Sequence, residues 1–269
     1  MPTTNNHKSG HLLLAILNIL LFSGMITMNA LANILPINGL NTGELSDFYP
    51  NLFVPAGLTF SIWGVIYLLL FIYVVYALIA AIRGNKDIIC IKTQIAFAVT
   101  CILNSVWIIF WHYKLIVWSE ITMLALLATL IYLFQKTAKL NTKGFVKTFA
   151  VSVPINIYLG WITVATIANT TALLVAKNWG AWGISESSWT VTMILIATCI
   201  TVIILIKKQT LCFALVIIWA LIGIYIKRIG ADILYKDIIF TLSLSLGLLV
   251  VVSVYVLIKK RLQAQNNNQ

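Results

Sequence analysis

The sequence predicts an all-α protein, a polytopic membrane helical bundle with about eight transmembrane helices. Of its 269 residues, 61% are hydrophobic and only 9% are charged, and the mean hydropathy is +1.00. A soluble domain of this length needs far more charge on its surface. The apolar residues also form long continuous runs. Because a helix rises about 1.5 Å per residue, roughly 20 such residues cross a hydrocarbon core of roughly 30 Å.

Eight runs reach this length, and each is expected to be helical because lipid offers the backbone no hydrogen-bond partners. The seventh is the shortest. The expected bounds are 12–32, 58–82, 89–111, 116–135, 148–173, 188–206, 211–226 and 237–258.

The first run has a competing interpretation as a signal peptide. Residues 30–32 read Ala-Leu-Ala, the small-x-small form of a cleavage site. The apolar run before it is long for a signal peptide, however, and the basic residues ahead of it are few. We therefore expect a retained helix and leave cleavage as the alternative.

The basic residues between the runs predict the orientation. If the N-terminus is cytoplasmic, 13 of the 18 Lys and Arg residues fall in cytoplasmic segments and five fall outside. This imbalance fits an even number of spans with both termini cytoplasmic. The Lys227–Lys236 connection disagrees with this orientation, because it lies outside yet holds three of the five basic residues placed there. The basic residues that give the chain its net charge of +11 are expected to contact anionic lipid headgroups. No nucleic-acid partner is expected.

One connection is long, running from about residue 33 to residue 57. It contains Pro36, Pro50 and Pro55 together with the acids Glu44 and Asp47. A connection this long in a compact bundle is more often a lid or a binding element than a tether. The polar segment 263–269 is expected to be a disordered tail.

Aromatic and amide side chains recur at helical spacing inside three of the runs, and in the first run Asn18 and Asn29 share a face. They form stripes because residues three, four, seven or eleven apart share a helix face. Buried amides often only join helices, but several aromatic residues facing one interior would form a flat, weakly polar pocket for a planar apolar ligand. The stripe residues are Trp63 and Tyr67; Asn104, Trp107 and Trp111; and Tyr158, Trp161 and Asn169.

Groups that could perform catalysis are missing from these stripes. No Asp, Glu, Lys or Arg occupies the middle of a run, and Glu120 and the other acids fall at or beyond the ends. His112 is expected at headgroup level. The sequence contains no nucleotide-binding, hydrolase or metalloprotease motif. We therefore expect no catalytic residue, no metal ligand and no cofactor, and we expect that the protein is not an enzyme.

Three motifs, in order along the chain, resemble the tryptophan-rich sensory protein family, also called TspO/MBR or translocator protein-like. The first is Pro55 followed by Trp63 and Tyr67, and the second is Leu103-Asn104 with Trp107. The third is similar to the family's fifth-helix pattern and comprises Tyr158, Trp161, Ala165 and Asn169. The nearest proline, Pro154, lies earlier than the family's proline, so the fifth helix is expected to bend one turn earlier. Ala56 replaces the family's second consecutive proline, and the basic residue before the loop prolines is missing.

The resemblance covers roughly residues 10–175 and is to the larger bacterial version, with extra C-terminal helices. It implies a five-helix core over residues 1–175, including the 33–57 loop, followed by three further transmembrane helices over 176–262. It also implies a location in the bacterial cytoplasmic membrane, and a homodimer as a further expectation. The family binds tetrapyrroles, and some members bind sterols.

These observations lead to a hypothesis of function. The chain is expected to be a membrane-embedded receptor or sensor for a planar hydrophobic molecule, tetrapyrrole- or sterol-like. The alternatives are a transporter for such molecules, or an accessory protein that packs against a partner complex. The expected ligand-binding residues are Trp63, Tyr67, Asn104, Trp107, Tyr158, Trp161 and Asn169, and Pro55 and Gly57 are the expected lid residues.

Overall fold

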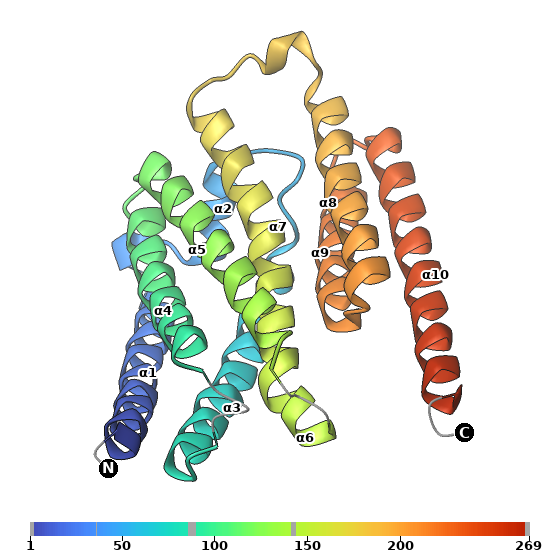
Figure 1. The fold of residues 1–269 in the computed structure, drawn as a ribbon. Coiled ribbons are helices and arrows are strands. Elements are labelled where there is room, and N and C mark those ends of the chain that lie inside the picture. The colour runs from blue at the N-terminus through green and yellow to red at the C-terminus, as the bar shows by residue number, and fades with distance from the viewer. Residues whose placement is uncertain (1–2, 36, 86–89, 141–143, 267–269) are drawn as a thin grey trace.

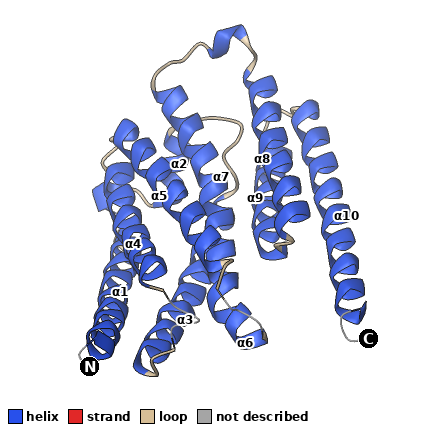
Figure 2. Ribbon diagram, viewed as in Figure 1, coloured by secondary structure: helices blue, strands red, loops and turns tan. Residues whose placement is uncertain are grey.

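The computed structural model describes residues 3–35, 37–85, 90–140 and 144–266. Throughout these residues the chain is helical or loop, with no strand (Figure 2). Eight helices are long and apolar enough to cross a membrane, which confirms the predicted fold class. The long helices are α1 (Thr3–Ile34), α3 (Ile62–Ile82), α4 (Ile91–His112), α5 (Ile116–Thr137), α7 (Val153–Ala176), α8 (Glu186–Lys208), α9 (Leu211–Ile229) and α10 (Lys236–Asn266).

The expected spans agree with these helices to within a few residues, except that α1 begins earlier and α10 ends later than expected. The eighth helix, α10, continues to Asn266 and so takes in four residues of the predicted tail. Residues 267–269 of that tail lie outside the described residues, as does Pro36 of the long connection.

The fifth span is irregular where its proline lies. It begins with α6 (Phe145–Lys147), continues through a π-helical turn (Thr148–Ser152) and then enters α7, with Pro154 in the first turn. Proline lacks an amide hydrogen and its ring crowds the preceding turn, so the wider π turn accommodates it. The disturbance therefore precedes Tyr158, as the position of the proline predicts.

The first five spans form one group. Figure 1 shows α1, α3, α4, α5 and α7 standing side by side, with the start of α1 and the end of α10 at the same end of the molecule. Helix α4 packs against α1 and α5, α7 packs against α5 and α3, and α1 also packs against α3. The interior of this group holds the aromatic and amide stripes.

Helices α8, α9 and α10 pack on one another and meet the group mainly through α9 and α7. Two glycines bring the elements close. A Cβ on Gly160 would lie 3.1 Å from the Phe213 carbonyl oxygen and from Val216 Cβ. A Cβ on Gly223 would lie 2.0 Å from Thr59 Oγ1. Small residues of this kind permit close helix packing in membranes, where burial of apolar surface drives little association.

Helix α1 belongs to the core. Met25 and Ala32 are fully buried, and the Asn29 side chain hydrogen-bonds to Asn104 on α4. The Ala-Leu-Ala sequence of the alternative cleavage site is thus partly enclosed at Ala32. This packing supports retention of the first span, because its removal would expose apolar side chains and an amide of α4.

The long connection folds into an ordered cap. It contains a 3-10 turn (Ile37–Gly39), helix α2 (Thr42–Phe48), an extended stretch, and a second 3-10 turn, η2 (Gly57–Ser61), that leads into α3. Helix α2 starts with a reciprocal capping box, in which the Asn41 side chain accepts from the amides of Gly43 and Glu44 while Glu44 accepts from the Asn41 amide. Three otherwise unpaired amide groups at the helix start are thereby satisfied.

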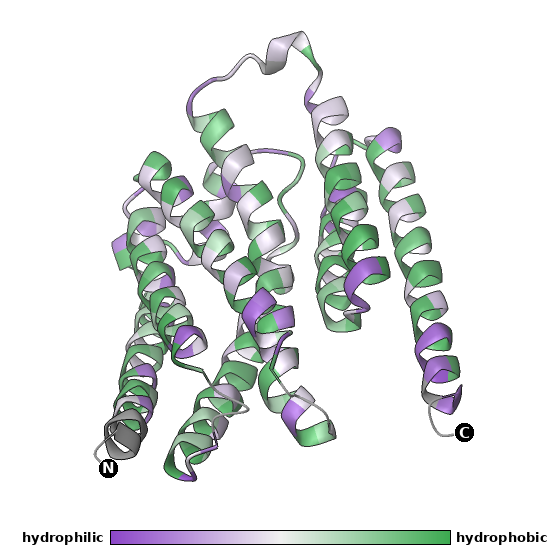
Figure 3. Ribbon diagram, in the orientation of Figure 1, coloured by the Kyte–Doolittle hydropathy of each residue, from purple (hydrophilic) through white to green (hydrophobic). Residues whose placement is uncertain are grey.

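Charge differs between the two ends of the bundle. Hydrophilic residues gather at helix ends and connections, while apolar residues line the middles (Figure 3). The end that carries α2 holds five basic and six of the seven acidic residues of the chain. The discordant connection after α9 is partly neutralised there, because Lys227 forms an ion pair with Asp47 of the cap.

Candidate functional site

A small cavity lies under the cap, between α3, α4 and α7. Its volume is about 40 Å³, which is room for about three water molecules. The lining residues are Thr42, Ser46, Pro55, Phe60, Trp63, Trp107, Trp111, Trp161, Val164, Ala165, Ala168 and Asn169. The cap thus contributes side chains to the cavity, and a planar ring system can enter only if the lining moves apart.

Four indole rings line the cavity. The Trp63 ring lies 6.3 Å from that of Trp107 and 6.1 Å from that of Trp161, measured between centroids. Trp111 stacks on Trp107 at 6.1 Å, and Phe60 meets Trp161 edge to face. Such clusters offer flat faces and polarised edges to an aromatic ligand. These rings come from η2, α3, α4 and α7, so only the folded bundle assembles them.

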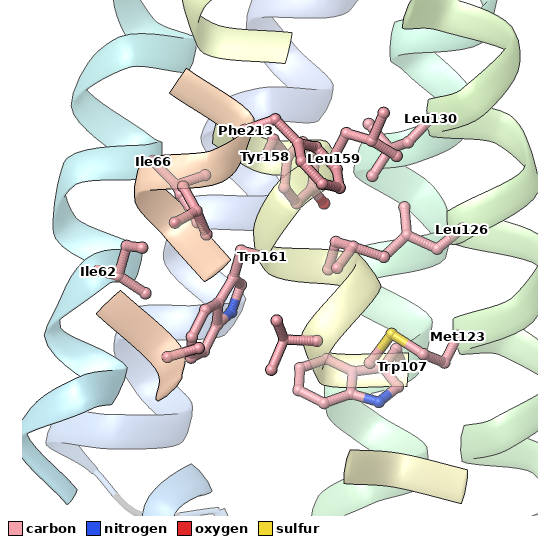
Figure 4. Close-up of a cluster of buried hydrophobic side chains, with 14 of the residues drawn as sticks. Ile62, Ile66, Trp107, Met123, Leu126, Leu130, Tyr158, Leu159, Trp161 and Phe213 are labelled. Carbon is pink, nitrogen blue, oxygen red and sulfur yellow. The ribbon is translucent and has the colours of Figure 1, made fainter. Parts of the chain in front are cut away.

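Figure 4 shows that the predicted aromatic side chains lie in the interior. Trp107 on α4 and Tyr158 and Trp161 on α7 lie within a cluster of buried hydrophobic side chains that also includes Ile62 and Met123. All three are at most 5% exposed. They are therefore not interfacial anchors, a role that the strongly exposed Trp182 can fill.

Asn169 orients one wall of the cavity. Its Oδ1 accepts hydrogen bonds from Trp107 Nε1 at 3.1 Å and from Ser119 Oγ at 2.9 Å. Its Nδ2 donates to Glu120 Oε2 at 2.7 Å, and Thr170 Oγ1 donates to the other oxygen of that carboxyl. Glu120 is near the start of α5, as the sequence suggests, but it is buried rather than exposed to the headgroups. The amide orientation is fixed by donors on one side and an acceptor on the other, so the Trp107 indole is held in place.

A second hydrogen-bond chain lies beside the cavity. Asn29 Nδ2 donates to Asn104 Oδ1 at 2.7 Å, and Asn104 Nδ2 donates to the Tyr158 hydroxyl at 3.0 Å. The chain joins α1, α4 and α7 through fully enclosed groups. Its pattern fits the joining role that buried amides often have between membrane helices.

Two polar atoms near the cavity have no partner among the described residues. They are Trp161 Nε1 and the Tyr67 hydroxyl oxygen. Trp161 lines the cavity, whereas Tyr67 stacks on Trp63 at 5.4 Å. A buried indole N–H without an acceptor costs free energy that a ligand acceptor atom could recover.

His112 holds the cap on α4. Its Nε2 lies 3.2 Å from Thr42 Oγ1 and its Nδ1 lies 3.0 Å from the Ile37 carbonyl oxygen, while its own carbonyl accepts from Asn38 Nδ2. The residue is fully buried at the end of α4, and its expected depth at headgroup level stays a prediction. The ordered cap covers this side chain, and the sequence around it did not show that cover.

The opposite edge of the cap rests on α9. Ala56 N donates to the Gly223 carbonyl at 3.0 Å, and Trp219 Nε1 donates to the Thr59 carbonyl at 2.9 Å. These contacts lie directly after Pro55, which lines the cavity. The three C-terminal helices therefore hold one flank of the cover over the cavity.

The structure separates the predicted site residues into two layers. Trp63, Trp107, Trp161, Asn169 and the lid residue Pro55 line the cavity. The other three ligand-binding candidates lie behind this lining, and Gly57 starts η2 without reaching the cavity. The residues behind the lining are Tyr67, Asn104 and Tyr158.

Sequence reasoning missed several lining residues. Trp111 shares its helix face with Asn104 and Trp107, so its position seven residues after Asn104 was a usable signal. Phe60, Thr42 and Ser46 come from the cap, whose path over the bundle no periodicity predicts.

The lining offers stacking faces and a few hydrogen-bond groups. None of the described lining side chains is ionisable. The arrangement can bind an apolar, flat molecule and orient one polar edge of it.

Comparison with known proteins assigns the chain to a family. A family model described as TSPO-like protein matches residues 15–256, so the match continues past residue 175 through α8 and α9 and into α10. No curated protein and no solved structure matches the chain. The match takes in most of the chain, including the helices that carry the cavity. The chain belongs to the TSPO-like protein family.

Proposed function

We propose that this protein is a membrane receptor for a planar hydrophobic molecule of tetrapyrrole or sterol-like character. The observation that carries the proposal is that Trp161 Nε1 has no hydrogen-bond partner among the described residues and belongs to a cavity that four indoles line. A ligand would stack between the rings and accept a hydrogen bond from this group. Membership of the TSPO-like family supports a hydrophobic ligand.

Binding is coupled to movement of the cap in this proposal. The cavity of about 40 Å³ is too small for a multi-ring molecule. Helix α2 is the side that we propose moves, because its described hydrogen bonds to α4 are two long ones, from Trp111 Nε1 to the Thr42 carbonyl at 3.4 Å and between His112 Nε2 and Thr42 Oγ1 at 3.2 Å. The Pro55 side of the cap is bonded to α9 by shorter hydrogen bonds and would stay in place. A receptor of this kind reports occupancy through the position of α2 at one membrane surface.

Binding without transport or chemistry is the form we propose. The Asn29–Asn104–Tyr158 chain and the Trp63–Tyr67 stack close the interior beside the cavity. A path across the bilayer would have to break these buried contacts. Catalysis would need titratable groups at the ligand, and the described lining offers none. We also propose that both termini face the cytoplasm of a bacterial cell, because 13 of 18 basic residues lie at that end.

Tryptophan fluorescence tests the site. Protoporphyrin is titrated into the purified protein in detergent, and quenching is compared for wild type, Trp161→Phe and Trp182→Phe. Trp161→Phe keeps an aromatic ring but removes the free N–H, whereas Trp182 is an exposed indole outside the cavity. We expect saturable quenching with an affinity reduced about tenfold in Trp161→Phe and unchanged in Trp182→Phe. Unsaturable quenching, or equal affinity in all three proteins, would reject the site.

A flux assay separates binding from transport. Wild-type protein in sealed proteoliposomes is given external protoporphyrin, and the internal concentration is followed with and without an ion gradient. We expect no internal accumulation above protein-free vesicles. Protein-dependent accumulation that Trp161→Phe slows would replace the receptor with a transporter that uses the same cavity.

A further inference from the structure

A second, larger cleft opens at the same end of the bundle, between the cap and the C-terminal helices. Its volume is about 430 Å³. The cap contributes Asp47 and Asn51, the start of α8 contributes Glu186, and the end of α9 contributes Lys227 and Arg228. We call it the outer cleft. It shares no lining residue with the cavity under the cap that Trp63, Trp107, Trp111 and Trp161 line, which we call the indole cavity.

Arg228 is the unusual group in this cleft. The residue is 8% exposed, and its Nε is buried without a hydrogen-bond partner among the described residues. No described carboxylate lies within ion-pair distance of its guanidinium, although Glu186 and Asp47 act on it electrostatically from further away. A guanidinium is always charged and presents five donors in a planar fork. An enclosed arginine whose counter-ions do not touch it is costly, so the fork is suited to an anion from outside the chain.

The rest of the lining limits which anion can enter. Asp47 and Glu186 carry two negative charges and Lys227 and Arg228 carry two positive charges, so the described lining is neutral overall. Apart from the Lys227–Asp47 pair, the lining holds the opposite charges Arg228 and Glu186, which act on each other electrostatically without a described ion pair between them. A simple anion would be repelled by the carboxylates. A ligand with a negative and a positive group matches both sites.

The position of the cleft favours a lipid as the source. Arg228 is the second-last residue of the α9 span, which runs over Leu211–Ile229. Such a residue lies at the depth of the lipid headgroups rather than in bulk water. The neighbouring Ile226 and Ile229 are half exposed, so acyl chains can cover this part of α9.

We propose that the outer cleft binds a phosphate ester that also carries an ammonium group, as in the headgroup of a phosphatidylethanolamine. Arg228 takes the phosphate oxygens through its fork, and Glu186 takes the ammonium. The ligand joins α8 to α9 beside the cap, because its two charged ends meet Glu186 and Arg228. This site is separate from the receptor proposal and stands or falls independently of it.

The test uses the whole protein in detergent after lipid removal. Three probes are titrated by calorimetry: short-chain phosphatidylethanolamine, phosphatidylglycerol with the same chains, and free phosphoethanolamine. The variants are Arg228→Met, Glu186→Gln and the control Arg83→Met, which changes an exposed arginine at the other end of the bundle. We expect saturable binding of phosphatidylethanolamine to wild type and Arg83→Met. We expect affinity at least about tenfold weaker in Arg228→Met, because charged hydrogen bonds are lost.

The second variant distinguishes a zwitterion from an anion. Glu186→Gln should weaken phosphatidylethanolamine binding but not phosphatidylglycerol binding, because the carboxylate that it removes attracts an ammonium group and repels an anion. Glu186 is exposed, so this variant is expected to fold even if Arg228→Met does not. Competition by free phosphoethanolamine at equal affinity would identify the headgroup alone as sufficient, whereas binding of the lipid form only would identify a membrane lipid. Undiminished binding in Arg228→Met, or equal affinity of wild type for both lipids with no effect of Glu186→Gln, would overturn the proposal.

Discussion

The contact between Gly223 and Thr59 provides a sharp test of how α9 holds the cap. A Cβ at position 223 would lie 2.0 Å from Thr59 Oγ1, 2.8 Å from its Cγ2 and 2.9 Å from its Cβ. Rotation of the threonine side chain cannot relieve the last contact, because Cβ does not move with χ1. Gly223→Ala therefore has to displace α9 from η2, and it strains the hydrogen bond from Ala56 N to the Gly223 carbonyl.

The magnitude follows from two opposing effects. Extra atoms in a well-packed interior cost about 1–3 kcal/mol. Alanine is favoured over glycine inside a helix by up to about 1 kcal/mol. The contacts fall well below ordinary van der Waals separation and Thr59 is 2% exposed, so the steric effect dominates. We expect Gly223→Ala to lower the free energy of unfolding by about 1–2 kcal/mol.

Thermal unfolding in detergent, followed by tryptophan fluorescence, measures this change. The control is Gly64→Ala in α3, where an added Cβ meets nothing within 4 Å. It should leave Tm unchanged or raise it slightly, whereas Gly223→Ala should lower Tm by a few degrees, about 2–4 °C per kcal/mol. The fluorescence should also report a changed environment for Trp219, whose indole donates to the Thr59 carbonyl.

A second substitution tests the cause. Thr59→Ala removes the Oγ1 and Cγ2 contacts but keeps the Cβ contact at 2.9 Å, so it should restore only part of the stability lost in Gly223→Ala. The reasoning fails if Gly223→Ala is as stable as Gly64→Ala, because α9 would then not press on η2. Full additivity of the two substitutions would likewise show that they do not share a contact.

Three further predictions concern the hydrogen-bond groups around the indole cavity. Glu120→Gln replaces one of two carboxyl acceptors by a donor and should lower stability by about 1–2 kcal/mol in thermal unfolding; unchanged Tm would mean that Asn169 does not depend on it. Asn104→Leu leaves the Tyr158 hydroxyl without its partner and should cost about 1–3 kcal/mol, which an equally stable variant would disprove. His112→Ala frees the start of α2, so limited proteolysis should cut the cap faster and protoporphyrin should associate faster; rates equal to wild type would place the opening elsewhere.

Hydrophobic patterning predicted the helices well because each span satisfies its backbone within itself. The position of Pro154 likewise predicted the irregular turn that precedes α7. Stripe positions predicted Trp63, Trp107, Trp161 and Asn169 near one another, and all four line the cavity. The same stripes did not distinguish lining residues from the layer behind, since Asn104 and Trp107 share a helix face yet serve different neighbours.

The sequence by itself determined that this chain is a bundle of eight membrane helices with aromatic and amide faces, because length and hydropathy are properties of each segment alone. Only the tertiary structure decided that the connection over 33–57 folds as a cap, that His112 and Glu120 are buried, and that α9 supports the cap through Gly223. These features arise from contacts between segments far apart in the chain. Such contacts depend on the shapes of both segments, and the residue pattern of one segment does not predict the shape of the other.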